Sequence, residues 1–186
     1  MHIDPRYVFL ESEHVLLKVL DKQDIIESNW FGWFNDAERC KLNQHHYFGN
    51  TPENQETILY EISTKEKIQF GIIDKSEQTA ICGVVSLQDL DYISGTAHIA
   101  IMIDKIKESN PRIFAEAMKL MLQHGFNELR LNKIVANSMN KHLPVALKTL
   151  FNFELEGVLK SHVYKGGEYR DVYLTSVWQN TVSFRD

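Results

Sequence analysis

The sequence predicts an α/β fold in which a mixed, mostly antiparallel sheet of about seven strands is flanked by helices. One observation is that several segments alternate apolar and polar residues with the period of two that a strand requires. Another is that longer segments between them place their apolar residues on one helical face. The third is the order of these segments, which runs strand, two helices, three strands, helix, strand, helix and two strands. Because no repeat or linker divides the sequence, we expect residues 1–186 to form a single domain.

The composition is that of a soluble globular protein. Hydrophobic residues make up 44% of the chain and charged residues 24%. The formal net charge of −5 argues against nucleic acid as the main partner, since its phosphates repel an acidic protein. Two cysteines, Cys40 and Cys82, are too few for a disulfide framework, and the sequence shows neither a signal peptide nor an apolar stretch of membrane-spanning length. We therefore expect a cytoplasmic protein without a membrane partner.

In the first half of the chain, helix-start signals and strand patterns define five elements. Asp21 and Thr51 are expected N-cap residues, and Pro52 follows at the first position of its helix. The apolar side of the first helix consists of Ile25, Ile26, Trp30 and Phe34. The expected elements are a strand over 14–20, helices over 22–33 and from 52 to about 65, and a hairpin of strands over 68–73 and 79–87.

The stretch from residue 96 to residue 130 is the centre of the predicted fold. Over 96–104 the residues alternate in the manner of a strand with two distinct faces. Asn110 followed by Pro111 then starts a helix whose apolar stripe continues to residue 129. At such a helix N-terminus, free N–H groups and the helix dipole favour an anion. Positive side chains near this point are Lys105, Lys107 and Arg112; an ordinary connection with solvated charges is the alternative.

The last third of the chain adds strands and one short helix. The turn at residues 165–168 contains two glycines, and it folds the last two strands into a hairpin. The expected elements are a strand over 133–137, a helix over 144–150, a strand that begins at residue 153, and a final strand over 169–178.

The segment from residue 30 to residue 50 is dense in aromatic, amide and imidazole side chains. Such side chains can stack on a sugar or a base while bonding to its hydroxyl groups, which suits a polar small-molecule pocket. The candidate substrate-binding residues are Trp33, Asn43, His45 and Tyr47. The alternative is that the aromatic rings belong to the core. We expect no metal site, because the side chains of the neighbouring His45 and His46 diverge.

Several short strings, in the same order along nearly the whole chain, resemble the GNAT superfamily of acetyl-coenzyme-A-dependent N-acetyltransferases. They are most similar to the branch that contains ribosomal-protein N-terminal acetyltransferases and acetyltransferases of amino-sugar nucleotides. Residues 29–38 (NWFGWFNDAE) are similar to the opening string of that branch. The other strings are 115–117 (AEA), 125–134 (GFNELRLNKI), Asn140, 152–157 (NFELEG) and 164–171 (YKGGEYRD).

This resemblance implies where acetyl-CoA, the only cofactor expected, would bind. The pyrophosphate would lie against the loop 105–112 and the start of the helix that follows it. The pantetheine arm would lie between strands 96–104 and 133–137, which the family splays apart. The residues implied in cofactor binding are Met102, Ile103, Lys105, Lys107, Asn110, Arg112, Ile113, Asn137 and Asn140.

The chain departs from the family pattern at three points. Asn110 and Arg112 stand where the family loop has glycines, so charge-assisted bonds from Arg112 would replace backbone contacts to the phosphates. Lys148 stands where many members carry a catalytic tyrosine. Asn140 lies one residue further than usual from the pair at 152–153. These departures keep open a non-catalytic coenzyme-A-binding module, or a structural or interaction protein that retains only the fold.

Acetyl transfer to an amine needs a group that removes a proton and donors for the developing oxyanion. His98 is the candidate base, because strand alternation places it opposite the buried isoleucines and beside the small Ala100. Backbone N–H groups near Met102 and Ile103 are the candidate donors, and Asn140 is the third catalytic candidate. The alternatives are a structural, hydrogen-bonded His98 and a chain of water molecules as the base.

The expected acceptor is a small primary amine, preferably an amino-sugar nucleotide, with a protein N-terminus as the alternative. The preference rests on the ring-rich segment described above, which lacks the dense carboxylate cluster that would hold a basic peptide. A homodimer is possible, and neither nucleic acid nor a membrane is expected as a partner.

Overall fold

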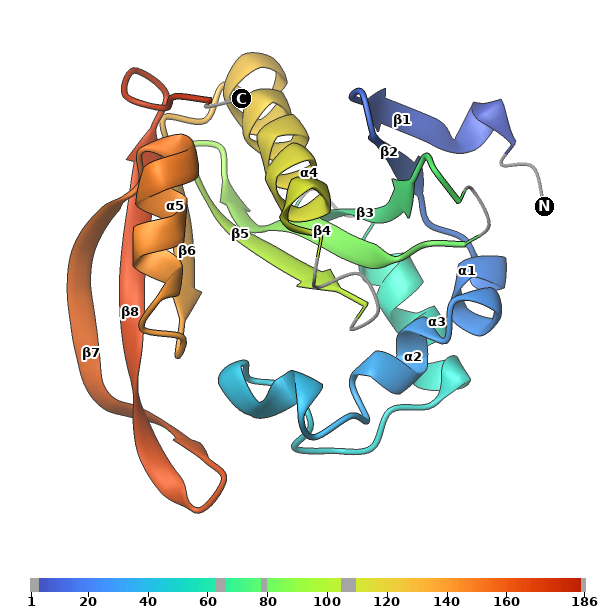
Figure 1. Ribbon diagram of the computed structural model, residues 1–186, viewed down its shortest axis with the longest axis horizontal. Helices are drawn as coiled ribbons and strands as arrows, with labels where there is room; N and C mark the ends of the chain where they lie inside the picture. The colour runs from blue at the N-terminus through green and yellow to red at the C-terminus, as the bar shows by residue number, and fades with distance from the viewer. Residues whose placement is uncertain (1–3, 63–65, 78–79, 105–109, 185–186) are drawn as a thin grey trace.

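The protein forms one continuous eight-stranded sheet with the order β1-β2-β3-β4-β5-β6-β8-β7. The structure is a computed structural model, and it describes residues 4–62, 66–77, 80–104 and 110–184. All neighbouring strands are antiparallel except β5 and β6, which are parallel. The predicted α/β class with a mixed, mostly antiparallel sheet is therefore confirmed (Figure 1).

The strands and helices follow one another closely along the chain. The strands are β1 (Val8–Glu11), β2 (Val15–Val19), β3 (Ile68–Asp74), β4 (Gly83–Asp91), β5 (Thr96–Ile103), β6 (Lys133–Ser138), β7 (Glu154–Lys165) and β8 (Glu168–Trp178). The α-helices are α1 (Lys22–Glu27), α2 (Trp30–Trp33), α3 (Pro52–Glu61), α4 (Pro111–Gln123) and α5 (Leu143–Phe151). Short turns of other helix types are η1 (Pro5–Tyr7), η2 (Arg39–Leu42) and the π-helical η3 (His124–Glu128). No helix in the described part of the chain is both long and apolar enough to cross a membrane.

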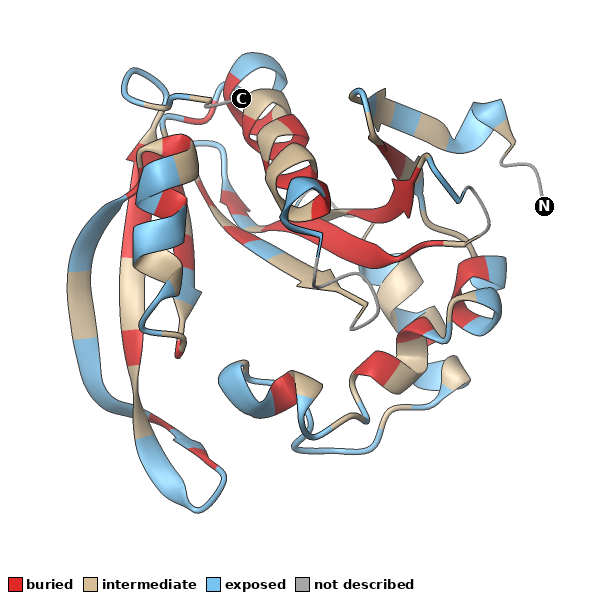
Figure 2. Ribbon diagram, in the orientation of Figure 1, coloured by how far each residue is buried: buried red, intermediate tan, exposed pale blue. Residues whose placement is uncertain are grey.

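The two larger apolar cores lie on opposite faces of the sheet. Helices α4 and α5 pack on one face, where Ala97 and Ile99 of β5 join the larger core. The other face packs against α1, α2 and α3, and Met102 of β5 belongs to that side. Figure 2 shows the buried residues along α4 and the central strands. The alternation along β5 thus separates a core face from a second face that carries His98, Ala100 and Met102.

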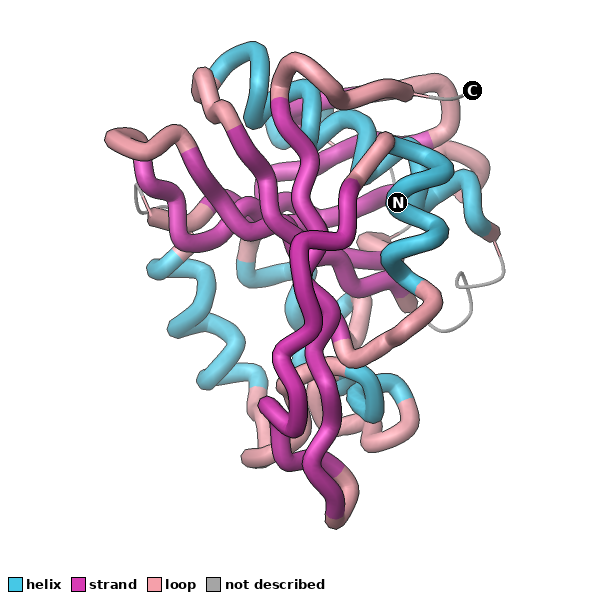
Figure 3. The backbone as a smooth tube through the Cα atoms, turned by 90° about the vertical axis from the view of Figure 1, so that its left-hand side faces the viewer, coloured by secondary structure: helices cyan, strands magenta, loops and turns pink. Residues whose placement is uncertain are grey.

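The predicted splay in the sheet is present between β5 and β6. These strands pair only at Thr96↔Lys133, Ala97↔Ile134 and His98↔Val135. Beyond this point β5 pairs only with β4, and β6 pairs only with β8. Figure 3 shows the long β7–β8 hairpin reaching past the rest of the sheet. The sheet therefore divides into two halves that share a short parallel junction.

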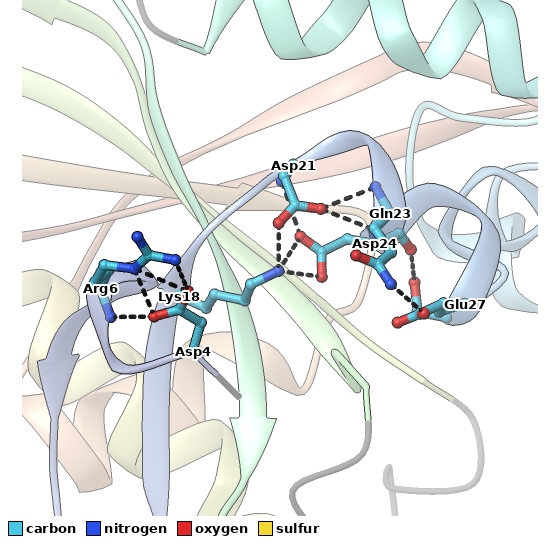
Figure 4. Close-up of polar contacts among 8 residues, drawn as sticks. Asp4, Arg6, Lys18, Asp21, Gln23, Asp24 and Glu27 are labelled. Atoms are coloured by element: carbon cyan, nitrogen blue, oxygen red, sulfur yellow. Dashed lines mark hydrogen bonds and ion pairs between the residues drawn. The ribbon is translucent and has the colours of Figure 1, made fainter. Parts of the chain in front are cut away.

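The corner between β2 and α1 is fixed by charge as well as by capping. Asp21 accepts from the backbone N–H of Gln23 and Asp24, and Asp24 accepts from the N–H of Asp21. Lys18 donates to Asp21 at 3.0 Å and to both carboxylate oxygens of Asp24 at 2.7 Å (Figure 4). This reciprocal cap explains why the helix begins at Lys22, as the sequence predicts.

The prediction of a single helix over 22–33 is wrong. The chain is helical over α1 and α2, but Asn29 between them adopts a left-handed conformation with φ 56°. Asparagine tolerates this conformation, which redirects the chain. As a result Trp30 is buried, as predicted, while Ile26, which was expected on the apolar side, is 63% exposed.

Other predictions also differ from the structure, among them the helix from residue 52, which ends at Glu61 rather than near residue 65. The sheet has an eighth strand, β1, which the sequence does not predict. Its four residues carry too short a pattern, and the segment forms a strand because it pairs with β2. The second strand of the predicted hairpin lies at 83–91 rather than 79–87. The α-helix that was expected to reach residue 129 ends at Gln123 and continues as η3, where the N–H of Leu129 bonds to the carbonyl of His124.

Candidate active site

His98 lies at the point where β5 and β6 separate. It is the last residue of β5 that pairs with β6, and its side chain is 44% exposed on the face opposite α4. Its Nδ1 atom lies 3.1 Å from Oδ2 of Asp89 at the irregular end of β4. A neutral His98 that donates from Nδ1 to Asp89 keeps the lone pair of Nε2 as a proton acceptor. The pair therefore has the geometry of a base oriented by a carboxylate.

The C-terminal half of β5 has a free edge toward β6. Met102 and Ile103 are half-buried there, and Ala100 is exposed. On the opposite edge β5 stays paired with β4 as far as Gly83↔Ile103. In the described part of the chain no strand pairs with this edge of β5 beyond His98, so its backbone N–H groups can meet an extended ligand, whereas the carbonyl of Ile103 already accepts from Arg39.

Arg39 connects the segment after α2 to the end of β5. Its Nη1 donates to the carbonyl of Ile103 at 2.8 Å, and its Nη2 lies 3.4 Å from Oδ1 of Asp104. The side chain is only 7% exposed and stacks over the ring of Trp33 at 5.6 Å. Arg39 is not among the residues predicted from the sequence, although its position in an aromatic-rich segment is a signal, since guanidinium groups stack on such rings.

Of the four predicted substrate-binding residues, His45 and Tyr47 contact the β7–β8 hairpin near its turn. Asn43 accepts from the backbone N–H of His45 at 2.9 Å and thereby shapes the turn. Tyr47 donates from its hydroxyl to the carbonyl of Tyr164 at 3.0 Å. The fourth residue, Trp33, is 3% exposed and belongs to the core. Its ring supports Arg39 and does not line the opening.

The ring of His45 sits in a positive and partly desolvated environment. It packs edge-on against Phe34, with 4.7 Å between ring centroids. Partial burial of the ring lowers the pKa of His45, and the positive charges of Lys165 and Lys67 lower it further. Burial also lowers the pKa of Lys67 itself, against the opposing effects of Glu61 and Asp89. The lowered pKa favours the neutral form of the His45 imidazole.

The start of α4 is capped in the predicted way. The side chain of Asn110 accepts from the N–H of Arg112 at 3.2 Å, and Pro111 occupies the first turn. Ile113 is 1% exposed, so its side chain belongs to the core. Lys105 and Lys107 lie outside the described residues. Within the described part of the predicted loop, Asn110 and the exposed Arg112 remain.

A hydrogen-bonded chain fixes the side chain of Arg112. Its Nη1 lies 3.0 Å from Nε2 of His14, whose Nδ1 lies 2.7 Å from Oε1 of Glu116. Glu116 also accepts from the hydroxyl of Ser12 and from the N–H of His14. Burial would raise the pKa of the Glu116 carboxyl, but these hydrogen bonds outweigh it and lower the pKa. The chain attaches the first turns of α4 to the start of β2.

The two asparagines of the predicted site lie near the end of β6. Asn137 is exposed on β6 and pairs with Leu174 of β8, beyond the last contact with β5. Asn140 uses Oδ1 to accept from the N–H of His142 at 3.0 Å, which helps to start α5. Lys148 is exposed on α5. Among residues with defined placement, no group of three or more possible metal ligands is found.

Comparison with known proteins is consistent over most of the chain. The family model of the acetyltransferase (GNAT) domain matches residues 14–146. A putative ribosomal N-acetyltransferase of Bacillus subtilis, YdaF, is 23% identical over 89% of this chain and 92% of that protein. Spermidine N-acetyltransferase from Vibrio cholerae, solved in complex with CoA and spermine, superimposes with a TM-score of 0.81 at 20% identity, over 91% of this chain and 98% of that chain. Ribosomal-protein-S5-alanine acetyltransferase from Vibrio fischeri gives a TM-score of 0.78 at 20% identity, over 95% and 98% of the two chains.

Proposed function

Because the chain belongs to the acetyltransferase (GNAT) domain family, we propose that it acetylates the primary amine of a small molecule, with His98 as the general base. Family membership makes the chain an acyltransferase that uses acetyl-CoA as its co-substrate. The proposal concerns the acceptor and the residues that act on it.

The observation that carries the proposal is the divergence of β5 from β6 immediately after His98. The free edge of β5 beyond His98 suits the extended arm of acetyl-CoA, whose thioester supplies the acetyl group. The capped start of α4, with Arg112 beside it, suits the phosphates. The residues thus fit the co-substrate from the phosphates to the reacting carbon.

Each chemical task falls to a different part of this site. The amine nitrogen forms a bond to the acetyl carbon, and the bond from that carbon to sulfur breaks. His98 accepts the amine proton at Nε2 while Asp89 holds Nδ1. Backbone N–H groups near Met102 and Ile103 stabilise the negative charge that develops on the acetyl oxygen. Asn137 and Asn140 lie on the β6 side of the opening and are proposed contacts of the pantetheine arm.

For the acceptor we propose a small amine, with an amino-sugar nucleotide as the preferred class. Asn43, His45 and Tyr47 offer an amide, an imidazole and an exposed phenol ring, which suit a ring with hydroxyl groups. The names of the relatives make a polyamine and a protein N-terminus the competing acceptors. A single domain over 1–186, a cytoplasmic location and a possible homodimer without nucleic-acid partners remain predictions.

The test of the base is His98→Ala, with His162→Ala as a control on an exposed histidine of β7. We expect His98→Ala to lower the acetylation rate by about 100- to 10,000-fold near neutral pH without weakening acetyl-CoA binding. Turnover is followed by release of free CoA thiol, and binding by calorimetry. An unchanged rate and pH profile in His98→Ala would assign the base to water or to another residue.

A further inference from the structure

Arg112 and Glu116 are oppositely charged residues that lie one turn apart on α4. Side chains four residues apart on a helix are neighbours, and opposite charges at this spacing attract each other. In the described part of the chain, however, these two side chains form no ion pair with each other, and each contacts His14 instead. A residue at the start of β2 therefore separates two charges that the helix brings together.

The ring of His14 bonds to both charged groups in a defined direction. Its Nδ1 lies 2.7 Å from Oε1 of Glu116, and its Nε2 lies 3.0 Å from Nη1 of Arg112. A carboxylate only accepts hydrogen bonds and a guanidinium only donates them, so a neutral ring with its proton on Nδ1 and its lone pair on Nε2 satisfies both. The exposed Glu13 also lies 3.6 Å from Nε2, which is too far for a hydrogen bond.

The carboxylate of Glu116 is occupied by the turn between β1 and β2. It accepts from the hydroxyl of Ser12, from the backbone N–H of His14 and from the His14 ring. Three donors from one turn satisfy this carboxylate without any contribution from Arg112. The turn thus takes up the acceptor toward which the guanidinium of Arg112 would otherwise bend.

As a consequence, the charge of Arg112 stays at the N-terminal end of α4. Arg112 follows the cap residue Asn110 and Pro111, and side chains of a helix lean toward its N-terminus. A direct pair with Glu116 would draw the guanidinium one turn in the opposite direction. The contact with His14 uses only one N–H donor of the guanidinium. The rest of the group suits the phosphates that this helix end would receive.

We propose that His14 is a positioning residue for the co-substrate: it keeps Arg112 apart from Glu116 and so holds the guanidinium for the phosphates of acetyl-CoA. The inference rests on the proposed function, in which these phosphates lie at the start of α4 beside Arg112. Without His14, Arg112 and Glu116 would pair directly, and the cation would be neutralised before the co-substrate binds. His14 acts only through Arg112 and touches no reacting atom.

The first test measures the binding of CoA by calorimetry. His14→Ala should weaken binding by about 3- to 10-fold, which is the range of one hydrogen bond. Added salt should weaken binding less in His14→Ala than in wild type, because less positive charge then acts on the phosphates. His14→Gln should keep the affinity, since its amide offers an acceptor to Arg112 and a donor to Glu116. Equal affinities of wild type and His14→Ala would overturn the proposal.

Double variants distinguish positioning from a structural tie between β2 and α4. Adding Glu116→Gln to His14→Ala removes the carboxylate that captures Arg112, so the affinity for CoA should return to within about 2-fold of wild type. Adding His14→Ala to Arg112→Ala should cause no further loss, because His14 acts through Arg112. If His14 only ties its turn to α4, Glu116→Gln breaks the other end of the same tie and restores nothing. That result would reject the proposal.

Two controls keep the test independent of folding. His162→Ala, which removes an exposed histidine from β7, should bind CoA as wild type does. Urea unfolding records the stability of each variant, and His14→Leu, which removes both ring nitrogens but keeps an apolar side chain, takes the place of a His14→Ala that does not fold.

The binding of CoA requires neither an acceptor amine nor a base, which separates this inference from the proposed function. A loss of affinity in His14→Ala that Glu116→Gln reverses supports the inference even if no amine is acetylated, in which case the proposed function fails alone. Unchanged affinity in His14→Ala, together with acetylation that depends on His98, overturns the inference alone.

Discussion

Arg39 donates a hydrogen bond from Nη1 to the carbonyl oxygen of Ile103, at a distance of 2.8 Å. This contact joins the segment after α2, which leads into the proposed acceptor site, to the end of β5. Further along the same segment, His45 and Tyr47 contact the tip of the β7–β8 hairpin. The segment 39–47 therefore bridges the two halves of a sheet whose central strands have separated. It supplies by side-chain contacts a connection that strand pairing no longer provides.

Arg39→Met should destabilise the protein and weaken acetyl-CoA binding together. The substitution leaves the carbonyl of Ile103 and the carboxylate of Asp104 without their guanidinium partner in a mostly buried place. We expect a loss of about 1–3 kcal/mol in the free energy of unfolding, measured by urea denaturation. Calorimetry should show weaker binding of acetyl-CoA by Arg39→Met. Arg39→Lys should have a stability and an affinity between those of wild type and Arg39→Met. Unchanged affinity in a destabilised Arg39→Met would show that the end of β5 does not touch the co-substrate.

Arg112→Ala should weaken acetyl-CoA binding by about 1–3 kcal/mol if the guanidinium pairs with phosphate. Arg112 is exposed beside the capped start of α4, and its contact with His14 holds it there. The matched control is Lys22→Ala, which removes an exposed positive charge from α1. Calorimetric titration at two salt concentrations checks both variants. Equal affinities for Arg112→Ala and wild type would remove Arg112 from the site.

Most of the fold could be predicted from the sequence, because its long elements repeat one pattern over many residues. The strand 96–104 and the start of the helix at Pro111 were read from alternation and from one capping pair. The break at Asn29 could not be predicted, because a single left-handed residue inside an apolar stripe leaves the helical period intact. The short β1 was missed for a related reason: its order comes from pairing with β2.

Less of the site could be predicted, because its decisive contacts join segments far apart in the chain. Alternation was enough to place His98 on the open face, but its contact with Asp89 depends on an irregular strand end. Arg39 is a functional candidate only through its long-range contact with Ile103. A sequence pattern carries no information about such pairs. The roles assigned to the site residues stay predictions.

Glu116→Gln should reduce the stability of the protein. It should also make the free energy of unfolding depend less on pH in the acid range. The pKa of the Glu116 carboxyl is lowered below its ordinary value of 4.5 in the folded chain, mainly because hydrogen bonds from Ser12 and His14 outweigh burial. A lowered pKa stabilises the folded state above pH 4.5, and this contribution is lost as the pH falls through the folded value.

The measurement is urea unfolding of wild type and Glu116→Gln at a series of pH values between about 6 and 3. The difference in the free energy of unfolding between wild type and Glu116→Gln should be largest near the highest pH of the series and shrink as the pH falls. Glu27→Gln, which changes an exposed carboxylate on α1, provides the control. A difference that stays constant over the whole range would contradict the assigned role of the ionised carboxylate.

Gly83→Ala should damage the site through the backbone of β5. Gly83 is buried opposite Ile103, and a Cβ atom there would lie 2.7 Å from the carbonyl oxygen of Met102 and 3.1 Å from Cδ1 of Ile72. A backbone oxygen cannot rotate away as a side chain can, so β5 must shift. We expect a loss of about 1–3 kcal/mol in the free energy of unfolding. Gly49→Ala, where a Cβ would meet no atom within 4 Å, should change the free energy of unfolding by less than about 0.5 kcal/mol.

Gly83→Ala should also weaken acetyl-CoA binding in calorimetry, because Met102 and Ile103 flank the proposed path of the pantetheine arm. A variant that is destabilised but binds acetyl-CoA normally would place the arm elsewhere.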